Sequence, residues 1–329
     1  PIGGSGSEVD RVVHDSRVVA SGDLFCCVPG STYDGHEFAE GAVRAGAVAV
    51  IAERTLDLPV PVVIADSVRR VMPHLAAAVE GWPSRNLDLV GVTGTNGKTS
   101  VVHLLDAVLE RAGRTTATHG TLSGGRTTPE ATDLQPLLRS WVATGVDAAA
   151  IEVSSHALSQ HRVDGTTFAA VAFTNLSRDH LDFHGSMDDY EVAKARLFDG
   201  TFSNHGVVVV ADQAGRRMAD RARDAAMTVV EVGEPTEVVV SPDGVRFGWR
   251  SRTVTVHTGG RFTVANALVA AELSAVLGIH EDTVVEGLAA ARPVPGRFEL
   301  VALEGGPQVV VDYAHTPDAL THALVAARE

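Results

Sequence analysis

Apolar residues in this chain alternate between short β-branched runs and segments with helical spacing. Over residues 84–295 helical segments separate the strand-like runs, an order typical of a mainly parallel sheet wound with helices. The runs fall at 87–93, 148–154, 169–175 and 206–211. Short alternating strands around Ser241-Pro242-Asp243-Gly244 then predict a hairpin, followed by a helix at 266–277. We therefore expect an α/β fold with its central domain at 84–295.

A smaller α/β domain is expected at residues 1–83. Its elements are strand-like runs at 24–28 and 48–53, helical runs at 38–44 and 68–80, and a breaker at Gly81-Trp82-Pro83-Ser84. The adjacent Cys26 and Cys27 lie in the first run. We interpret them as buried small hydrophobic residues, because a metal site needs more ligands nearby.

A third unit begins at residue 296. Runs at 298–303 and 308–312 predict two strands joined over Glu304-Gly305-Gly306. Thr316 and Pro317 supply an N-cap and a first-turn proline for a helix that runs to the end of the chain.

The segment Gly94-Thr95-Asn96-Gly97-Lys98-Thr99-Ser100 carries the strongest chemical signal, since it lies between a predicted strand and a predicted helix. Glycines let backbone N–H groups approach phosphate oxygens, Lys98 can reach terminal phosphates, and the Thr99 hydroxyl suits Mg²⁺. The general pattern G-x-x-x-x-G-K-[ST] is not met, because its first glycine falls on Val92. A surface turn is the alternative, and the flanking elements favour a phosphate-binding loop.

Three further sites follow predicted strands. Glu152, Asn175 and the pair Asp179-His180 fall at or just after strand ends, where ligands gather in open α/β sheets. Glu152 is a hard oxygen ligand suited to Mg²⁺, and a helix-capping carboxylate is the alternative. Spacing alone places Lys194 on the exposed side of a helix that begins at Ser186.

The composition limits the classes of partner. The 329 residues carry 27 basic and 41 acidic side chains, a net charge of −14, which disfavours a nucleic-acid or anionic-membrane surface. No apolar run is long enough to span a membrane, and the N-terminus lacks a signal-peptide layout. We expect a cytoplasmic protein with no nucleic-acid partner and no membrane insertion.

The loop in the form T-G-T-N-G-K-T resembles that of the Mur ligases, which form amide bonds with ATP in peptidoglycan synthesis. Further matching segments occur in order over nearly the whole chain. They are His14 to Arg17, Gly22 to Phe25, Asp34 to His36, Thr127 to Glu130, Glu152 to Leu158, Phe173 to Asp182 and Val311 to Leu320. Together they are most similar to the branch that adds the third amino acid to UDP-N-acetylmuramoyl-L-alanyl-D-glutamate.

The resemblance implies a mechanism and its cofactors. ATP phosphorylates the free carboxylate of the nucleotide-sugar dipeptide, and the incoming amine attacks the acyl phosphate to give an amide. The implied catalytic residues are Lys98, Glu152, His180 and Lys194. Mg²⁺ is implied at Thr99, Glu152, His180 and Lys194, the last as a carbamate formed with CO₂. The implied ATP contacts are Gly94, Thr95, Asn96, Gly97, Lys98, Thr99, Ser100, Asn266, Arg297 and Asp312.

The resemblance also implies contacts to the UDP-sugar peptide. They are Ser16, Ser31, Thr32, Tyr33, Thr127, Thr128, Ser154, Gln160 and Arg162. His14 matches a backbone-type contact, and Arg126 stands where some relatives have asparagine, so its contact is not carried over. His315 and Asp318 are secondary candidates.

Mur ligases carry a complete Rossmann-like C-terminal domain, of which residues 296–329 match only the first part. The motif that selects meso-diaminopimelate or L-lysine lies in the rest, so the added amino acid cannot be read. We expect residues 1–329 to bind the UDP-sugar dipeptide and, weakly, ATP as a monomer, without forming the tripeptide. The alternatives are a folylpolyglutamate synthetase-like ligase, which the segments at 14–17, 22–25 and 152–158 disfavour, and an inactive nucleotide-binding fragment.

Overall fold

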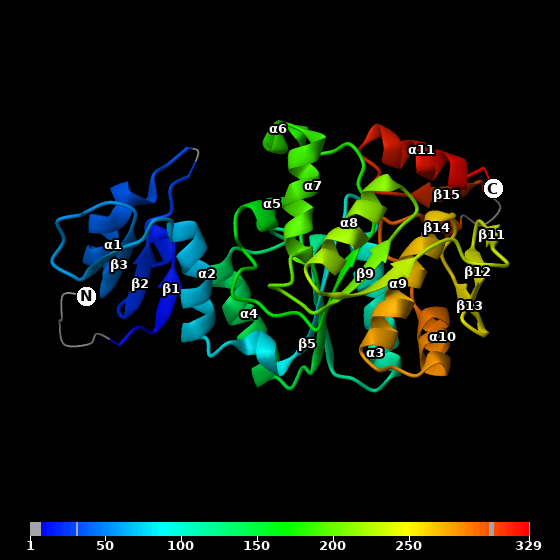
Figure 1. Ribbon diagram of the computed structural model, residues 1–329, viewed down its shortest axis with the longest axis horizontal. Coiled ribbons are helices and arrows are strands. Elements are labelled where there is room, and N and C mark those ends of the chain that lie inside the picture. The colour runs from blue at the N-terminus through cyan, green and yellow to red at the C-terminus, as the bar shows by residue number, and fades with distance from the viewer. Residues whose placement is uncertain (1–7, 31, 303–305, 329) are drawn as a thin grey trace. The chain divides into compact units, whose positions relative to one another are not determined.

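The computed structural model describes residues 8–30, 32–302 and 306–328, and the chain divides into two compact units. The first unit comprises Pro1–Asn86, Pro129–Ala143 and Ser159–Thr166. The second unit comprises Leu87–Thr128, Thr144–Leu158 and Thr167–Glu329. Figure 1 labels the helices and strands.

The first unit is built on a four-stranded parallel sheet in the order β1-β2-β3-β4. Side chains that alternate along β2 point to opposite faces, so Leu24 and Cys26 pack with Met72 of α2, whereas Phe25 packs with Ala42 of α1. The bounds are β1 Arg11–Val13, β2 Asp23–Cys26, β3 Ala49–Ala52, β4 Val62–Ile64, α1 Ala39–Ala45, α2 Val68–Val79 and α4 Ala131–Ala143, with short turns η1 Ser16–Val18, η2 Gly35–Phe38 and η3 Pro83–Asn86.

Cys26 and Cys27 are fully buried free thiols, which confirms their interpretation as small hydrophobic residues. Burial raises the pKa of Cys27 to about 12 and also raises the pKa of Cys26. Both thiols therefore stay protonated at neutral pH.

The second unit is built on a six-stranded sheet in the order β10-β9-β8-β5-β7-β6, and every neighbouring pair is parallel. The predicted parallel α/β fold is confirmed. The bounds are β5 Asp88–Thr93, β6 Thr116–His119, β7 Ala148–Glu152, β8 Ala170–Phe173, β9 His205–Val209, β10 Thr228–Val232, α3 Lys98–Arg111, α5 Ser155–Ser159, α6 Leu181–His184, α7 Met187–Ala195, α8 Gln213–Asp224, α9 Phe262–Val276 and α10 Glu281–Ala290, with η4 Thr121–Ser123 and η5 Arg196–Phe198.

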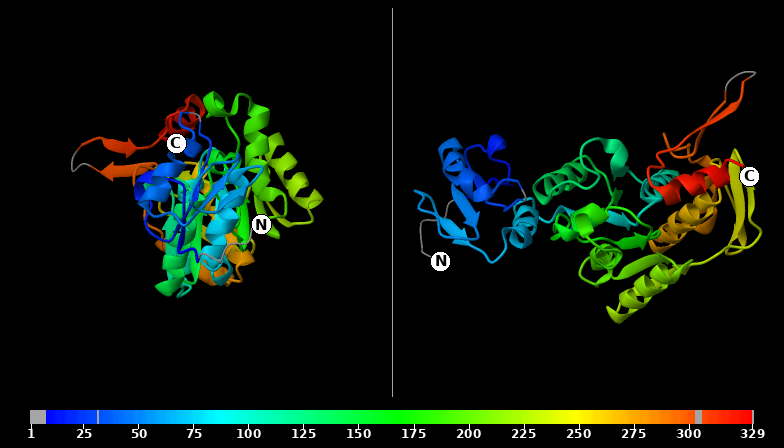
Figure 2. Two further views of the ribbon diagram at one scale, coloured as in Figure 1. Left: turned by 90° about the vertical axis from the view of Figure 1, so that its left-hand side faces the viewer. Right: turned by 90° about the horizontal axis from the view of Figure 1, so that it is seen from above.

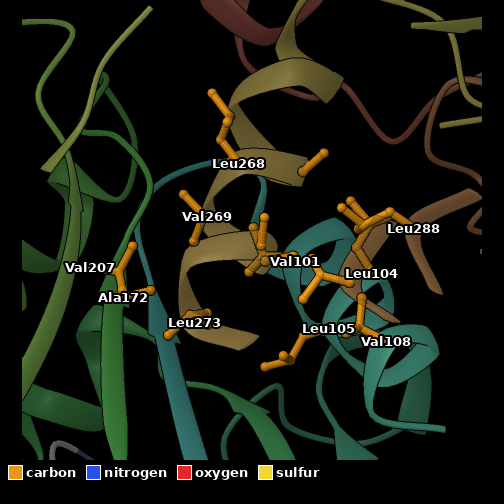
Figure 3. Close-up of a cluster of buried hydrophobic side chains, with 14 of the residues drawn as sticks. Val101, Leu104, Leu105, Val108, Ala172, Val207, Leu268, Val269, Leu273 and Leu288 are labelled. Carbon is orange, nitrogen blue, oxygen red and sulfur yellow. The ribbon is translucent and has the colours of Figure 1, made fainter. Parts of the chain in front are cut away.

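The core of the second unit joins this sheet to α3, α9 and α10. Val101, Leu105 and Val108 of α3 pack with Leu273 of α9 and Leu288 of α10 (Figure 3). All five side chains are buried, so the helix that begins at Lys98 is held against the sheet along its apolar face. This packing fixes the N-terminus of α3, where the glycine-rich loop ends.

Two small antiparallel sheets complete the second unit. β11 (Val239–Ser241), β12 (Gly244–Trp249) and β13 (Arg252–Val256) form one, and the predicted hairpin is confirmed with Ser241 opposite Gly244. β14 (Glu299–Ala302) and β15 (Gln308–Val311) form a two-stranded antiparallel sheet that projects from the rest of the second unit (Figure 2). The predicted link at 304–306 lies partly outside the described residues.

The final helix α11 spans Pro317–Ala326. Thr316 caps it by accepting a hydrogen bond from the Ala319 N–H, so the predicted cap is confirmed. The expected extension to residue 329 is wrong, since the helix ends at Ala326 and Ala327 caps it. Within the described ranges, no helix combines the length and the apolar character needed to cross a membrane.

Candidate active site

The loop Gly94–Ser100 connects β5 to α3 and depends on two glycines. Gly94 and Gly97 have φ of +145° and +86°, a region that favours glycine. A Cβ on Gly94 would lie 1.8 Å from Thr174 Oγ1, and one on Gly97 would lie 2.3 Å from Asn266 Oδ1. Larger residues at either position would therefore displace the loop or its supports.

The segment after β8 holds this loop in place. Asn175 accepts a hydrogen bond from the Asn96 N–H at 3.0 Å through Oδ1 and donates to the Asn96 carbonyl at 3.1 Å through Nδ2. The Thr174 hydroxyl donates to the same carbonyl at 2.6 Å. The Thr95 hydroxyl accepts from the Ser177 N–H at 3.0 Å. Asn175, predicted from its place after a strand, thus orients the loop directly.

Both lysines of the chain lie at this loop. The sequence contains only Lys98 and Lys194, and they donate to the Gly94 carbonyl at 2.9 and 2.8 Å. Lys98 also donates to the Thr95 carbonyl at 2.8 Å. Burial lowers the pKa of Lys98. The same backbone carbonyl therefore accepts hydrogen bonds from both amines, and only Lys98 of the two lines a cavity at the loop.

Lys194 belongs to α7, which Ser186 caps as predicted by accepting from the Asp189 N–H. The side chain is only 1% exposed, and its Nζ lies 4.5 Å from the centre of the Tyr190 ring. The expectation of an exposed lysine from spacing alone is wrong, because the inner face of α7 packs against the loop. Burial, followed by the charge of Lys98, holds the pKa of Lys194 well below its usual value, which favours the uncharged amine.

Glu152 ends β7 and is 1% exposed. Its Oε1 accepts from the Thr99 hydroxyl at 2.9 Å and from the Thr121 N–H at 2.9 Å, and Oε2 accepts from the Thr121 hydroxyl at 3.1 Å. Arg297 donates to Thr99 Oγ1 at 3.1 Å. The carboxylate and the hydroxyl that begins α3 are therefore adjacent, and both are oxygen ligands suited to Mg²⁺.

His180 follows β8 and has a side chain 43% exposed, with Nε2 3.5 Å from Asp179 Oδ2. Burial lowers its pKa, so the neutral imidazole that coordinates metals is favoured. A hydrogen bond of 2.9 Å joins Nε2 of the neighbouring His184 to the Ser155 hydroxyl. Burial, followed by the charge of His156, lowers the pKa of His184 to about 4.

A cavity of about 170 Å³ joins these groups. It is lined by Thr95, Asn96, Gly97, Lys98, Thr99, Ser100, Thr121, Thr127, Glu152, Ser154, Asp179, His180, Arg297, Tyr313 and His315. Within the described ranges, no group of three or more His, Cys, Asp or Glu side chains is placed to hold a metal ion. The adjacent oxygens of Thr99 and Glu152 suit Mg²⁺, which is usually held by one or two carboxylates together with substrate phosphates.

A second cavity of about 350 Å³ also borders the loop. Asn266, Arg297 and Asp312 line it, together with Asn96, Gly97 and Ser100, so the predicted ATP contacts outside the loop lie beside it. Arg297 also stacks over Tyr313 at 4.7 Å, and Asp312 accepts from the N–H of Phe298 at 2.8 Å. Asp318 lines neither cavity, whereas His315 lies 3.9 Å from Asp179.

Three predicted substrate contacts lie in the second unit. Thr128 is buried and its hydroxyl donates to the Glu152 carbonyl at 2.8 Å, and Ser154 N–H donates back to that hydroxyl at 3.0 Å. Thr127 lies 3.3 Å from the Thr121 hydroxyl. The structure therefore connects all three to the strand end that carries Glu152.

The other predicted substrate contacts lie in the first unit. Ser16 is half-buried, Thr32 is exposed and Tyr33 is 70% exposed, while Ser31 lies outside the described residues. Among the residues that the structure describes, no side-chain hydrogen bond joins Ser16, Thr32 and Tyr33 to one another or to a common partner. A hydrogen bond of 2.7 Å joins His14 Nδ1 to the Thr132 hydroxyl. His14 also lines a separate cavity of about 330 Å³.

Arg162 and Gln160 lie together in the first unit, where Arg162 Nη2 donates to Gln160 Oε1 at 2.5 Å. Arg162 Nε also lies 3.0 Å from Glu130 Oε1, and Arg69 donates to Glu130 Oε2 at 3.1 Å. Glu130 is 2% exposed. A buried carboxylate between two guanidinium groups thus supports a predicted contact residue.

Sequence reasoning gave no role to several of these residues. Glu130 lies inside a matched segment, but its pairing with Arg69 and Arg162 joins distant parts of the sequence. Thr121 directly follows Gly120 at a strand end, and this position is the local sequence feature that could have indicated its role. Tyr313 has no signal beyond its matched segment, and Tyr190 has none beyond its place on the helix that carries Lys194.

Comparisons with known proteins identify the family of this chain. The profile described as Mur ligase middle domain matches residues 92–274, and the profile described as Mur ligase family, catalytic domain matches residues 8–83. The UDP-N-acetylmuramoyl-L-alanyl-D-glutamate–2,6-diaminopimelate ligase of Bacillus velezensis is 38% identical, with 98% of this chain and 71% of that protein covered. The ligase of the same name from Streptomyces avermitilis is 40% identical, with 98% and 69% covered.

A solved structure is similar over the same extent. It is that of a UDP-N-acetylmuramoyl-L-alanyl-D-glutamate–2,6-diaminopimelate ligase, with a TM-score of 0.83 at 27% identity. The match covers 97% of this chain and 70% of that chain.

Proposed function

Because this chain belongs to the Mur ligase family, we propose that it is an ATP-dependent ligase that acts on UDP-N-acetylmuramoyl-L-alanyl-D-glutamate. The observation that carries the proposal is the cavity in which Lys98 and Thr99 of the loop face Glu152 and His180. A phosphate-binding loop beside buried oxygen ligands is the arrangement that phosphoryl transfer requires.

In the proposed reaction the γ-phosphoryl group of ATP moves to the free carboxylate of the D-glutamyl residue. An incoming amine then attacks the acyl phosphate, and the tetrahedral intermediate collapses to an amide and phosphate, with ADP already formed. Lys98 exchanges its carbonyl contacts for phosphate oxygens, and Arg297 beside Thr99 adds a second positive charge. Positioning and charge neutralisation dominate, because a carboxylate is already a competent nucleophile.

Mg²⁺ fits Thr99 and Glu152, whose oxygens lie 2.9 Å apart at the cavity. His180 and Lys194 are the proposed holders of a second ion, the lysine as a carbamate. The buried Lys194 amine fits this role, since its lowered pKa favours the uncharged form that combines with CO₂. When bound, the ions neutralise charge on the transferred phosphoryl group.

We assign the adenosine end of ATP to the cavity beside Asn266, Arg297 and Asp312. The remaining loop contacts are Gly94, Thr95, Asn96, Gly97 and Ser100. The proposed contacts to the nucleotide-sugar peptide are Ser16, Ser31, Thr32, Tyr33, Thr127, Thr128, Ser154, Gln160 and Arg162. The names of the relatives favour 2,6-diaminopimelate as the amine.

The domain assignment 1–83, 84–295 and 296–329 belongs to this proposal, as does action as a monomer. The cytoplasm is the proposed location, because ATP and a UDP-linked substrate are cytoplasmic metabolites.

Titration calorimetry with two candidate substrates tests the proposal. We expect saturable binding of UDP-N-acetylmuramoyl-L-alanyl-D-glutamate and none of a reduced folate. Folate binding with no response to the UDP compound would favour the folylpolyglutamate synthetase-like alternative. Binding of the UDP compound and ATP without formation of an acyl phosphate that borohydride can trap would favour the non-catalytic alternative.

A further inference from the structure

Thr121 follows β6 and contacts both carboxylate oxygens of Glu152. Its backbone N–H donates to Oε1 at 2.9 Å, and its hydroxyl donates to Oε2 at 3.1 Å. The hydroxyl of Thr99 is a further donor, at 2.9 Å to Oε1. Because Glu152 is 1% exposed, these protein groups set the orientation of its carboxylate.

The direction of the hydrogen bonds follows from the number of protons. An ionised carboxylate only accepts, so the Thr121 hydroxyl uses its single proton on Glu152. The Thr127 hydroxyl, 3.3 Å from the Thr121 hydroxyl, then donates to it. A one-way chain therefore runs from Thr127 through Thr121 to Glu152.

Gly120 provides the space for this contact. A Cβ on Gly120 would lie 2.2 Å from Glu152 Oε1 and 2.6 Å from its Cδ. The Gly120 backbone is extended, so the requirement for glycine is steric rather than conformational. Any larger residue would push the carboxylate away from Thr121.

We propose that Thr121 is a positioning residue that orients Glu152 for a divalent cation and links it to Thr127. This inference rests on the proposed function, in which Glu152 contacts that cation. Thr121 is suited to the task because one residue supplies two donors, one from the backbone and one from the side chain. Groups that orient a metal ligand in this way commonly change metal affinity by about 10- to 100-fold when they are removed.

The test measures Mn²⁺ affinity by electron paramagnetic resonance of the free ion, with β,γ-methylene-ATP present. Thr121→Val keeps the side-chain shape and the backbone donor but removes the hydroxyl, and we expect about tenfold weaker Mn²⁺ binding. Thr121→Ser restores the hydroxyl and should bind within about threefold of the wild type. Thr116→Val is the matched control. Thr116 begins β6, the strand that precedes Thr121, and this variant should leave Mn²⁺ affinity unchanged.

Two further measurements separate the possible failures. Thermal unfolding of each variant shows whether Thr121→Val acts through stability, and Gly120→Ala should weaken Mn²⁺ binding by displacing Glu152 even though Thr121 is intact. Wild-type affinity in Thr121→Val, together with weak binding in Glu152→Gln, would overturn the positioning role alone. Wild-type affinity in Glu152→Gln would instead overturn the cation role of Glu152 and the inference built on it.

Discussion

The phosphate loop of the second unit and the candidate nucleotide-sugar contacts of the first unit differ in how their residues are held. Around Gly94–Ser100, side chains from the segment after β8, from α7 and from α9 converge on one short segment. Tyr33 is 70% exposed, and it has an aromatic neighbour in Phe38, 6.3 Å away between ring centres. The loop is thus organised before any ligand arrives, whereas Thr32 and Tyr33 of the first unit present their side chains to solvent. Arg162 of the first unit is instead held by Glu130.

This difference predicts different consequences of mutation. In the organised region a side chain stabilises the charge on the transferred phosphoryl group in the transition state, so its loss should reduce turnover strongly. In the exposed region a side chain adds to binding, so its loss should reduce affinity modestly and leave stability unchanged. The predictions below test this contrast, from the largest expected effect to the smallest.

Lys98→Ala should reduce ATP turnover by about 100-fold or more, because a charge that stabilises the transition state is lost. The fold should persist, since Thr174 and Asn175 also hold the loop by hydrogen bonds to Asn96. ADP formation in a single turnover and circular dichroism are the measurements. Unchanged turnover in a folded Lys98→Ala variant would contradict the assignment of this segment as a phosphate-binding loop.

Lys194→Ala should reduce turnover by about 10- to 100-fold, with partial rescue by short-chain carboxylic acids that replace the carbamate oxygens. The presence of only two lysines makes the carbamate directly observable by ¹³C NMR with labelled bicarbonate. A carbamate signal should appear in the wild type and disappear in Lys194→Ala. The same signal in both proteins, or in neither, would contradict the second-ion role.

Glu130→Gln should lower the free energy of unfolding by about 2 kcal/mol, because a carboxylate paired with two guanidinium groups becomes neutral. Binding of the UDP-sugar dipeptide should weaken through Arg162, while binding of an ATP analogue stays unchanged. Urea denaturation and calorimetry measure the two effects. Glu40→Gln is the control, since Glu40 and its partner Arg44 are both 75% exposed; equal losses in the two variants would refute a special role for Glu130.

Tyr33→Ala should weaken binding of the UDP-sugar dipeptide by about fivefold, the effect of losing one stacking contact to a base. Tyr33→Phe keeps the ring and should bind like the wild type. Calorimetry distinguishes the variants, and stability should not change. An effect on ATP-analogue binding instead would show that Tyr33 belongs to the other region.

The sequence predicts the organised region well because its chemistry is local. Val90 and Val92 belong to an apolar run, glycines punctuate the loop, and Val101, Leu104 and Leu105 have helical spacing. The strand Thr116–His119 is not predicted, because its T-A-T-H sequence has too few apolar positions to show a pattern. Its position at the edge of the sheet explains why it needs few.

The contacts made by side chains depend on tertiary structure, and the sequence does not show them. Lys194 looks like a surface residue on its own helix, and its burial arises only when α7 packs on the loop. Thr121 meets Glu152 across neighbouring strands, and Glu130 meets Arg69 and Arg162 from separate segments. The family resemblance identifies Lys194 but gives no partner for Glu152 or Arg162.

Trapping the acyl phosphate tests the central claim most directly. The protein is incubated with ATP, Mg²⁺ and UDP-N-acetylmuramoyl-L-alanyl-D-glutamate without an amino acid, and borohydride then reduces any acyl phosphate to an alcohol that mass spectrometry detects. The account predicts the alcohol in the wild type, and none in Lys98→Ala or without ATP. Absence of the alcohol in wild-type protein that binds both substrates would contradict the account.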